Sequence, residues 1–559
     1  MSNSKTEATM AKAVPTVAPA PASPAAFQAL TPGGERKGWL TIPFVLVCLV
    51  FIFMGLLNFN AKLFLMGDDA NYILDAYNFM HRHAYPRQSS LYGLILAAII
   101  FLAGTNVVML KCFSFLFAFT GFVTLYRICY KRVDNRILYP VLIYSAISSN
   151  MQFYTSSTLS EACYMMVQYL YTGYFFYFTD RLASGKDMRK HWILLGFAGL
   201  VMSLGKNVAL IIPFAVVAYF LVYKQWRYAF KALGWYLLFK VPYEVMLYFI
   251  YKNNTGSSQI EQILVKDIYH YEAGHESLAG FGMRLVKNAQ IYLGQVTPNE
   301  LGITTQGWTT LIATLLVIFI VAAAMVFAYK RNRYIFFIGL YTVILSGVTF
   351  LALQPAVAQD RIIIVLVPYI FLLLFYGALT LADRFNAEHA SVNRIGFYIL
   401  LAYSGFVTLS KASATIQESL PVLQENLSGD PYYGYSQDCI NYLEMGKWIT
   451  EHIPEDQVVA VRKPNGISVY NKGRYFLGIY SCPNDKDSDQ MLAALKEQKV
   501  IYMILASLRA DPNVANPNNI ITTLHRYCAK IIEKYPQAIT IVHTIGTAEP
   551  CYLVKINYP

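Results

Sequence analysis

Acidic and basic residues gather in one short stretch of this chain, directly after its first long apolar segment. The stretch runs from Gly67 to Arg87 and places the adjacent acids Asp68 and Asp69 before an aromatic, amphipathic segment that includes Tyr72. A carboxylate near an apolar phase is costly unless it is hydrated, paired or used in a reaction. Two interpretations follow: a reaction centre at a membrane interface, or a solvated loop whose first acid caps a helix.

The composition decides the class of protein in which these acids work. The chain has 559 residues, of which 56% are hydrophobic and only 14% are charged. Soluble domains carry about 25% charged residues, so we expect an α-helical polytopic membrane protein. The net charge of +12 does not indicate nucleic acid, because Lys and Arg cluster in short loops between apolar segments, as the positive-inside rule predicts. The expected partner is the bilayer, with no nucleic acid.

Three regions differ in texture along the chain. Residues 1–38 are rich in Ala, Pro, Ser and Thr, which predicts a disordered cytoplasmic tail. Residues 39–411 contain about eleven apolar segments and form the predicted transmembrane domain. Within it, the first external loop at 59–106 includes interfacial helices, and a long external loop spans 252–307. Residues 412–559 alternate helical and strand patterns, which predicts a small extracytoplasmic α/β domain.

One short apolar segment determines the topology of the rest. Ser89–Ala103 has about 15 residues, whereas a span needs roughly 20, so we expect it to lie along the interface. With that choice, every dense Lys/Arg loop lies inside. The segment His191–Tyr223 must then be a hairpin broken at Gly205-Lys206-Asn207, because a single helix of about 33 residues would be roughly 50 Å long.

The same topology brings the unusual charges of the chain to the external ends of their helices. Each has an ordinary explanation: Lys206 could snorkel, Asp360 and Arg361 could pair with each other, and Glu161 could be a helix N-terminal acid. Together they favour an external cavity for a charged ligand. The set is Asp68, Asp69, Glu161, Lys206, Asp360 and Arg361.

The C-terminal region contains no glycine-rich phosphate loop and no nucleophile motif, so we interpret it as a lid or docking module. Its four cysteines in an oxidising compartment predict at least one disulfide, with the pairing open: Cys439, Cys482, Cys528 and Cys551. The pattern predicts helices at Ile440–His452, Gln490–Glu497 and Asn519–Lys534, strands at Val458–Arg462, Val500–Leu505, Ile539–Ile545 and Cys551–Ile556, and a turn with a short strand at Gly466–Arg474.

These motifs, in this order, resemble the glycosyltransferase-C (GT-C) superfamily, in the branch of the protein O-mannosyltransferases and the lipid A aminoarabinose transferase. The first external loop of that branch begins with an Asp-Asp/Glu pair and a nearby Tyr, as Asp68 to Tyr72 do here. Its interfacial Pro-Pro-Leu-Tyr core resembles Ser89-Ser90-Leu91-Tyr92. Its later Ser/Thr-Asp/Glu, hairpin Lys and elbow Arg-Tyr resemble Ser160-Glu161, Lys206 and Arg361-Ile362.

Three positions depart from the pattern of that branch. Serines replace the interfacial prolines, Ile362 replaces the usual Tyr, and Gln88 stands where a Lys is often found. Arg87 is the candidate to supply that missing charge. These departures concern the contacts to the donor phosphate more than the fold.

The resemblance implies a GT-C fold and an integral-membrane glycosyltransferase of the bacterial inner membrane. Such an enzyme moves a sugar from a polyprenyl-phosphate donor to a hydroxyl of a lipid, glycan or protein acceptor on the extracytoplasmic face. Asp68 would be the general base and Asp69 would orient the acceptor, or the two would exchange roles. Arg87, Lys206 and Arg361 would bind the donor phosphate. A single displacement implies inversion at the anomeric carbon.

Alternatives remain for the cofactor and for the class of protein. No cofactor is implied with certainty; a divalent metal is an alternative at His270-Tyr271-Glu272 and His275-Glu276, where a solvated loop is the simpler explanation. A lipid-linked sugar transporter or flippase needs no base, and it should tolerate the loss of Asp68. A scaffold protein would leave the external charges unexplained.

Overall fold

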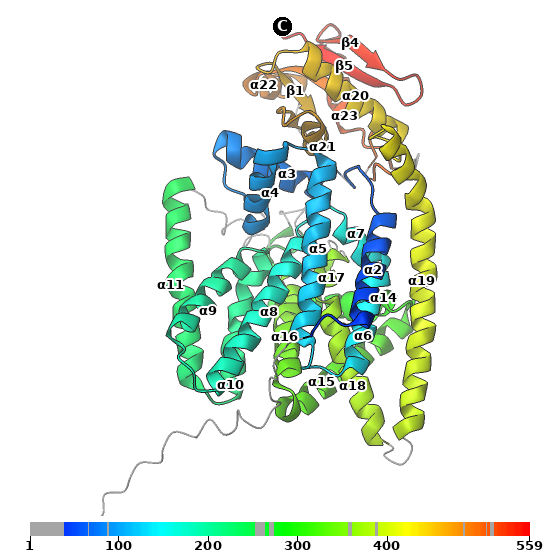
Figure 1. The fold of residues 1–559 in the computed structure, drawn as a ribbon. Coiled ribbons are helices and arrows are strands. Elements are labelled where there is room, and N and C mark those ends of the chain that lie inside the picture. Colours follow the sequence, from blue (N-terminus) through cyan, green and yellow to red (C-terminus); the bar gives the residue numbers. More distant parts are fainter. Residues whose placement is uncertain are drawn as a thin grey trace, which may run out of the picture.

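The computed structural model places a bundle of long helices beneath a small mixed α/β domain (Figure 1). We use "upper" for the end that carries this C-terminal domain and "lower" for the opposite end. The described residues are 38–64, 66–86, 89–251, 263–267, 273–355, 360–385, 390–483, 487–509, 511–514 and 519–559. The predicted tail at 1–38 therefore lies almost entirely outside the described residues, as do Arg87, His270, Tyr271 and Glu272.

The helical region consists of long apolar helices side by side, with shorter helices among and above them (Figure 1). In chain order they are α2 (Ile42–Leu57), α3 (Asp68–Arg82), α4 (Ser90–Ala103), α5 (Val107–Cys129), α6 (Asn135–Ile147), α7 (Ser149–Thr155), α8 (Glu161–Ala183), α9 (Arg189–Ser203), η1 (Asn207–Ile211), α10 (Ile212–Val222), α11 (Trp226–Tyr251), α13 (Leu278–Ile291), η3 (Tyr292–Val296), α14 (Thr297–Glu300), α15 (Trp308–Arg331), α16 (Arg333–Ala352), α17 (Arg361–Ile364), α18 (Val367–Phe385) and α19 (Ala390–Ser428).

The predicted spans each coincide with one or two of these helices. The spans are residues 39–58, 107–126, 137–152, 159–179, the two arms of 191–223, 230–251, 308–329, 334–350, 362–382 and 395–409. The predicted hairpin break is present, since α9 ends at Ser203, η1 begins at Asn207, and Lys206 between them has extended backbone angles. Five helices in the described part are long and apolar enough to cross a bilayer by length and composition. They are Val107–Cys129, Trp308–Arg331, Arg333–Ala352, Val367–Arg384 and Val392–Ser428.

Two short helices, α3 and α4, lie at the upper ends of the long ones (Figure 1). Acids in the first turn of α3 and the basic pair His81 and Arg82 in its last turn both suit the helix dipole. His83 then ends the helix with a left-handed φ of 54°. Helix α4 has 14 residues, or about 21 Å, which is too short to cross the roughly 30 Å hydrocarbon layer.

At the lower end, the basic loops that the sequence assigns to one side do meet. The carboxylate of Asp180 at the end of α8 accepts hydrogen bonds from Arg132 Nη2 at 2.5 Å and Arg333 Nη2 at 2.6 Å. The Tyr334 hydroxyl donates to the same carboxylate at 2.5 Å. Both arginines are buried. We call Arg132, Asp180, Arg333 and Tyr334 the lower ionic cluster; it joins the loop after α5, the end of α8 and the start of α16.

The C-terminal domain has a five-stranded mixed sheet in the order β2-β1-β3-β5-β4, with β1 parallel to β2 and β3, and β5 antiparallel to β3 and β4. Helices cover it (Figure 1). The elements are α20 (Gln437–His452), β1 (Val458–Val461), α21 (Pro464–Tyr470), β2 (Leu477–Gly478), α22 (Ser488–Glu497), β3 (Val500–Leu505), α23 (Thr523–Lys534), β4 (Ile539–Ile545) and β5 (Cys551–Ile556).

Two sequence expectations in this domain are corrected. The predicted turn and strand at Gly466–Arg474 is largely helix α21, because Pro464 occupies its first turn, where its missing N–H is harmless and its fixed φ suits the helix. The predicted disulfide is absent, since all eight cysteines are free. Cys439, Cys528 and Cys551 are buried in apolar surroundings, where cysteine packs as a small apolar residue.

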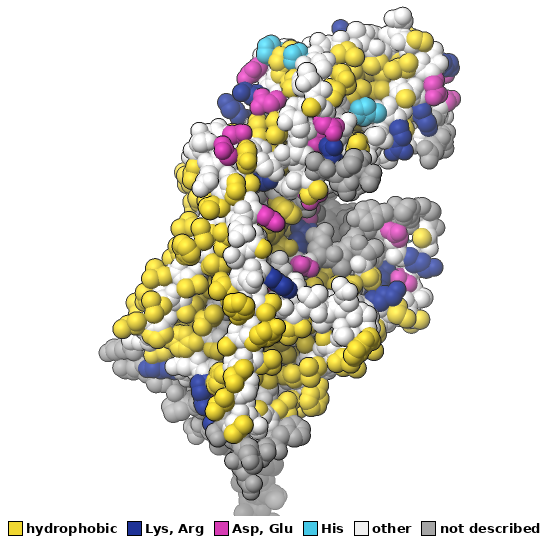
Figure 2. Space-filling view, turned by 90° about the vertical axis from the view of Figure 1, so that its right-hand side faces the viewer, with side chains coloured by type: hydrophobic (Ala, Val, Ile, Leu, Met, Phe, Trp, Pro, Cys, Tyr) yellow, Lys and Arg dark blue, Asp and Glu magenta, His cyan; other side chains and the backbone are white. Residues whose placement is uncertain are grey.

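A long helix connects the two regions. Helix α19 continues from the lower end to Ser428, so the domain boundary expected at 411/412 lies inside one helix (Figure 1). Hydrophobic side chains cover much of the surface of the helical region in Figure 2, whereas charged side chains gather on the C-terminal domain and in a hollow beneath it. The charged groups of the helical region in this view therefore include a set at the upper ends of the helices, beneath the C-terminal domain.

Candidate functional site

The first acid of α3 is accessible and paired. The Asp68 carboxylate accepts a hydrogen bond from Arg361 Nη2 in an ion pair. The side chain of Asp68 is 38% exposed and that of Arg361 is 23% exposed. The two residues are 293 positions apart in sequence; α3 supplies the acid at its N-terminus and α17 supplies the cation at its own.

The second acid of α3 is buried. Asp69 is 3% exposed, and its carboxylate accepts the N–H of Phe64 at 2.6 Å and that of Gly67 at 3.0 Å. Thr158 also donates to the Asp69 carbonyl at 3.2 Å. The adjacent acids thus differ: Asp68 is accessible, whereas Asp69 folds back on the loop before α3.

A second ion pair lies next to the first. Glu161, at the start of α8, is 1% exposed and its Oε1 accepts from Lys206 Nζ at 2.6 Å. Within the described residues, its Oε2 is buried with no hydrogen-bond partner. A buried carboxylate oxygen without a hydrogen-bond donor is energetically costly. Such an oxygen is a usual feature of sites that a ligand, a water or a change of partner completes.

The two pairs share one electrostatic environment. Burial alone would lower the pKa of Arg361, but the nearby carboxylates of Glu161 and Asp68 hold it above its ordinary value. We call Asp68, Glu161, Lys206 and Arg361 the upper ionic site. Four sequence-predicted residues from α3, α8, the α9–η1 break and α17 are therefore brought together.

Tyr72 fixes α3 against the start of α8. It lies one turn after Asp68, is 6% exposed, and its hydroxyl accepts from Ser160 Oγ at 3.2 Å. Its ring meets Tyr92 of α4 edge to face, with centroids 5.4 Å apart. Burial, together with the charge of Glu161, raises the pKa of Tyr72 to about 12, so this phenol is a neutral donor and not a base at neutral pH.

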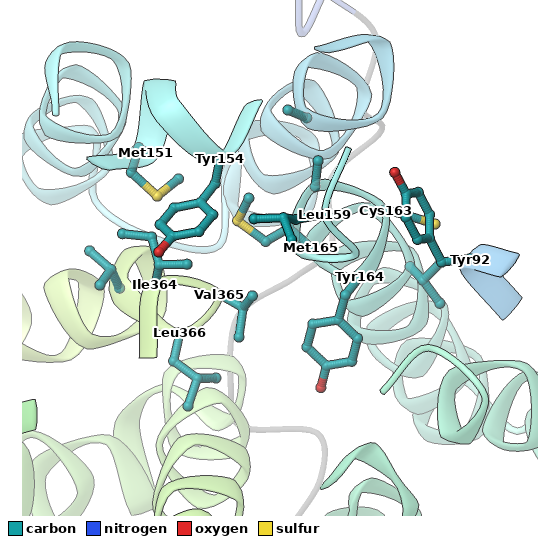
Figure 3. Close-up of a cluster of buried hydrophobic side chains, with 14 of the residues drawn as sticks. Tyr92, Met151, Tyr154, Leu159, Cys163, Tyr164, Met165, Ile364, Val365 and Leu366 are labelled. Carbon is teal, nitrogen blue, oxygen red and sulfur yellow. The ribbon is translucent and has the colours of Figure 1, made fainter. Parts of the chain in front are cut away.

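An apolar floor supports these groups. Figure 3 shows Met151 and Tyr154 of α7, Cys163 and Met165 of α8, and Ile364 at the end of α17, gathered in one buried cluster. Such close packing fixes the helix ends that carry the charges. Helix α17 has only four residues, and the burial of Ile364 in this cluster anchors it next to Arg361.

Asp360 and Glu300 form a neighbouring acidic group. Asp360 is exposed, and Glu300 is 3% exposed and accepts from Ser148 Oγ and Asn150 Nδ2, each at 2.5 Å. Burial raises the pKa of Glu300, and the charge of Asp360 adds to the rise. The sequence analysis missed Glu300. The available signal was an acidic residue near the end of the long external loop, shortly before the next apolar segment.

The metal alternative gains no structural basis in the described residues. Glu276 is paired with Arg284 at 3.0 Å, and His275 lies in an isolated strand bridge with Val265. No group of three His, Cys, Asp or Glu suitable for a metal occurs among the residues that the structure describes.

A separate groove of about 730 Å³ lies on the other face of α3. Tyr77, which lines it, is about 180° from Asp68 around the helix at 100° per residue. None of the predicted site residues that the structure describes lines this groove; its walls include Tyr77, His81, Phe101, Val108 and Lys472.

The likeness to known proteins is structural. No protein-family model matches the sequence, and no curated protein does. ArnT from Cupriavidus metallidurans bound to undecaprenyl phosphate is similar, with 11% identity, a TM-score of 0.50, and 91% of this chain and 97% of that chain covered. Its apo form gives 12% identity with the same TM-score and coverage.

An oligosaccharyltransferase from Archaeoglobus fulgidus in the apo form matches less well, with 12% identity, a TM-score of 0.48, and 84% and 70% of the two chains covered. The likeness to ArnT shows the fold. The GT-C membrane fold with a small C-terminal domain, expected from the sequence, is therefore confirmed.

Proposed function

We propose that this protein is a membrane glycosyltransferase that moves a sugar from a polyprenyl-phosphate donor to an acceptor hydroxyl. The observation that carries the proposal is the upper ionic site, where an accessible carboxylate, Asp68, faces Arg361 beside the buried Glu161–Lys206 pair. The similar ArnT structure is bound to undecaprenyl phosphate, which supports a lipid phosphate as the group that these cations bind.

The donor phosphate would bind to Arg361 and Lys206. A guanidinium matches the oxygens of a phosphate with two parallel hydrogen bonds, and an ammonium adds a compact charge. Both cations are paired with carboxylates here, so an arriving phosphate would compete for them. Arg87, outside the described residues, is proposed as a third cation for the same group.

This exchange of partners would prepare the base. When phosphate engages Arg361, the Asp68 carboxylate loses part of its ion pair and becomes a better proton acceptor. The acceptor O–H then attacks the anomeric carbon while Asp68 takes its proton. The bond from that carbon to the phosphate oxygen breaks, its electron pair stays on polyprenyl phosphate, and the configuration inverts.

The remaining site residues would support these steps. Fixed cations at the leaving phosphate oppose the negative charge that grows there. Asp69, being buried and bound to Phe64 and Gly67, would set the geometry of the loop and leave proton transfer to Asp68. Tyr72 would orient α3, and Asp360 would contribute to the acidic rim.

We also propose the orientation of the protein. The lower end carries the dense Lys/Arg loops that favour the cytoplasmic side, so the upper ionic site and the C-terminal domain would be extracytoplasmic, at the inner membrane of a bacterium. A reporter fused after Pro559 should report the extracytoplasmic side and one inserted at Asp134 the cytoplasmic side. Finding both on one side would contradict the orientation.

The decisive experiment compares Asp68→Asn with the wild type in two assays. The first measures the binding of undecaprenyl phosphate to purified protein in nanodiscs. The second measures the transfer of labelled sugar from polyprenyl-phosphate donors in membrane vesicles. The vesicles are prepared from a host strain that lacks the chromosomal copy of this gene and expresses the variant under test. We expect near-normal binding and a loss of transfer of about 10²- to 10⁴-fold, the usual contribution of a general base.

Asp383→Asn is the matched control, because Asp383 is a partly exposed aspartate paired with Arg394 at the lower end. It should leave both assays unchanged. Near-normal transfer by Asp68→Asn would remove Asp68 as the base. Wild-type protein that binds undecaprenyl phosphate but never transfers label would contradict the enzyme and favour a transporter.

A further inference from the structure

The loop that leads into α3 is bound mainly by residues far away in sequence. We call residues 58–67, of which all but Leu65 are described, the leading loop. The C-terminal end of α19 and the C-terminal domain reach it with side chains: Asn426 Oδ1 accepts the Ala61 N–H at 2.8 Å, and the Tyr470 hydroxyl accepts the Leu63 N–H at 3.0 Å.

The same domain also binds the carbonyl groups of the leading loop. Tyr435 donates its hydroxyl to the Leu63 carbonyl at 2.5 Å, and Asn513 Nδ2 donates to the Phe64 carbonyl at 2.9 Å. A loop without strand or helix partners must satisfy its backbone groups elsewhere. Here the C-terminal domain supplies partners for the N–H and the carbonyl of Leu63 and for the carbonyl of Phe64.

One lysine side chain crosses between the two regions. Lys62 is 8% exposed; its Nζ donates to the Gly434 carbonyl and to Asn513 Oδ1, the latter at 2.5 Å. It also lies over the ring of Tyr435 at 4.8 Å. From below, Lys111 of α5 donates to Asn60 Oδ1 at 2.7 Å and to the Lys62 carbonyl at 2.8 Å.

These contacts lead directly to the acids of α3. The Phe64 carbonyl accepts a hydrogen bond from Asn513, and the Phe64 N–H donates one to Asp69. A single residue therefore links the C-terminal domain to the first turn of α3. The neighbouring residue, Asp68, is the accessible acid of the upper ionic site. The position of Asp68 therefore depends on a loop that the C-terminal domain holds.

Two glycines allow the domain to seat closely on this region. A Cβ on Gly466 would lie 2.4 Å from the Cβ of Met66, and one on Gly473 would lie 2.3 Å from the ring of Tyr77. Met66 itself has a left-handed φ of 54°, a conformation that glycine adopts without strain. The contact surface thus runs from the end of the leading loop to the middle of α3.

We propose that the C-terminal domain is a positioning element for Asp68, acting through Tyr470, Asn513 and the seat of Gly466 on Met66. This inference rests on the proposed function for its catalytic consequence. Its structural part, that the domain orders the leading loop, is independent of any activity. The domain thereby acquires a role in proton transfer although none of its residues needs to touch the substrate.

A steric swap in the full-length protein tests the seat. Gly466 lies inside α21, where alanine is the better helix former, so Gly466→Ala harms only the contact with Met66. We expect faster amide hydrogen exchange in the leading loop and transfer slowed about 5-fold or more, the lower end of the usual cost of overpacking a contact. Met66 is buried, so Met66→Gly alone leaves a cavity and should impair both readouts. Combined with Gly466→Ala it removes the clash, so the double variant should be impaired less than the sum of the two single variants.

A second variant removes hydrogen bonds and introduces no steric clash. Tyr470→Phe with Asn513→Ala deletes the groups bound to Leu63 and Phe64, and should also speed exchange in the leading loop and slow transfer. Binding of undecaprenyl phosphate should change less than twofold, because Lys206 and Arg361 come from other elements. Tyr433→Phe, a partly exposed tyrosine of the same region, is the control and should change nothing.

The outcomes separate this proposal from the proposed function. Unchanged exchange in the leading loop of both Gly466→Ala and the Tyr470/Asn513 variant would overturn the ordering by the domain. Faster exchange with unchanged transfer would overturn the positioning of Asp68 while the enzyme stands. Additive effects of Met66→Gly and Gly466→Ala would contradict the seat of Gly466 on Met66. Absence of transfer in the wild type would instead refute the proposed function, and the exchange measurements would still decide the structural part.

Discussion

The lower ionic cluster and the upper ionic site use the same kinds of side chain in different proportions. Below, one carboxylate, Asp180, accepts from two buried arginines and a tyrosine, so both of its oxygens are engaged. Above, two carboxylates meet two cations, and one oxygen of Glu161 has no hydrogen-bond partner in the described chain. The carboxylate of the lower cluster is saturated by the protein, whereas the carboxylates of the upper site are not.

The difference shows how to separate a structural ion cluster from a functional one. Both lie at helix ends, and both join segments far apart in sequence. What distinguishes them is the state of their carboxylates: Asp68 of the upper site is accessible and one oxygen of Glu161 lacks a donor, whereas Asp180 has both oxygens engaged. An accessible acid beside an incompletely bonded one can take a further partner, so the state of the carboxylates points to the ligand site better than the number of charges does.

The largest effect should come from the lower ionic cluster. Asp180→Ala leaves two buried guanidiniums without their carboxylate, and we expect a loss of about 3–5 kcal/mol in stability, measured as thermal unfolding in detergent. Arg136→Ala at the same end is the control: its pair with Asp134 is exposed on both sides and contributes about 0–1 kcal/mol. Equal shifts in the unfolding temperature of both variants would mean that the lower ionic cluster contributes no more stability than an exposed ion pair.

The next effect concerns the cations of the upper ionic site. Arg361→Ala and Lys206→Ala should each weaken the binding of undecaprenyl phosphate about 10- to 100-fold, because a hydrogen bond to a charged group contributes roughly 1.5–3 kcal/mol. Isothermal titration in nanodiscs measures this. Arg394→Ala removes a partly exposed arginine at the lower end and should bind normally. Unchanged binding in both upper variants would assign these cations to structure alone.

The smallest effect sharpens the comparison most directly. Glu161→Gln keeps the shape but removes the charge that competes for Lys206, so undecaprenyl phosphate should bind several-fold more tightly, and most clearly at low salt. The corresponding change below, Asp180→Asn, should leave lipid binding as it is. Weaker binding by Glu161→Gln would show that this carboxylate supports the phosphate site by holding Lys206, and does not compete with the phosphate.

The sequence was sufficient for the fold and for the membership of the upper ionic site, for identifiable reasons. Hydropathy and basic loops depend on local composition, so the helices and the broken hairpin at Lys206 followed from the pattern. The order of loops then placed Asp68, Glu161, Lys206 and Arg361 at one end, where the structure brings them together.

Pairing and burial were beyond the sequence, because they depend on contacts between distant segments. The pairing of Asp360 with Arg361 was one ordinary explanation for these charges, but Arg361 pairs with Asp68. Asp68 and Asp69 are indistinguishable as letters, yet only one is accessible. The cysteines of the C-terminal domain read as a disulfide framework and are free residues, three of them buried in apolar surroundings, because compartment and composition say nothing about whether two sulfurs meet.

The uninterrupted helix α19 has a consequence for how such proteins can diverge. Its 39 residues extend over about 58 Å, and each residue adds about 1.5 Å and a rotation of 100°. An insertion of one residue below Asn426 would turn that side chain, and the whole domain above it, away from Ala61. Descendants of this gene should therefore change the length of α19 rarely, and in whole turns when they do.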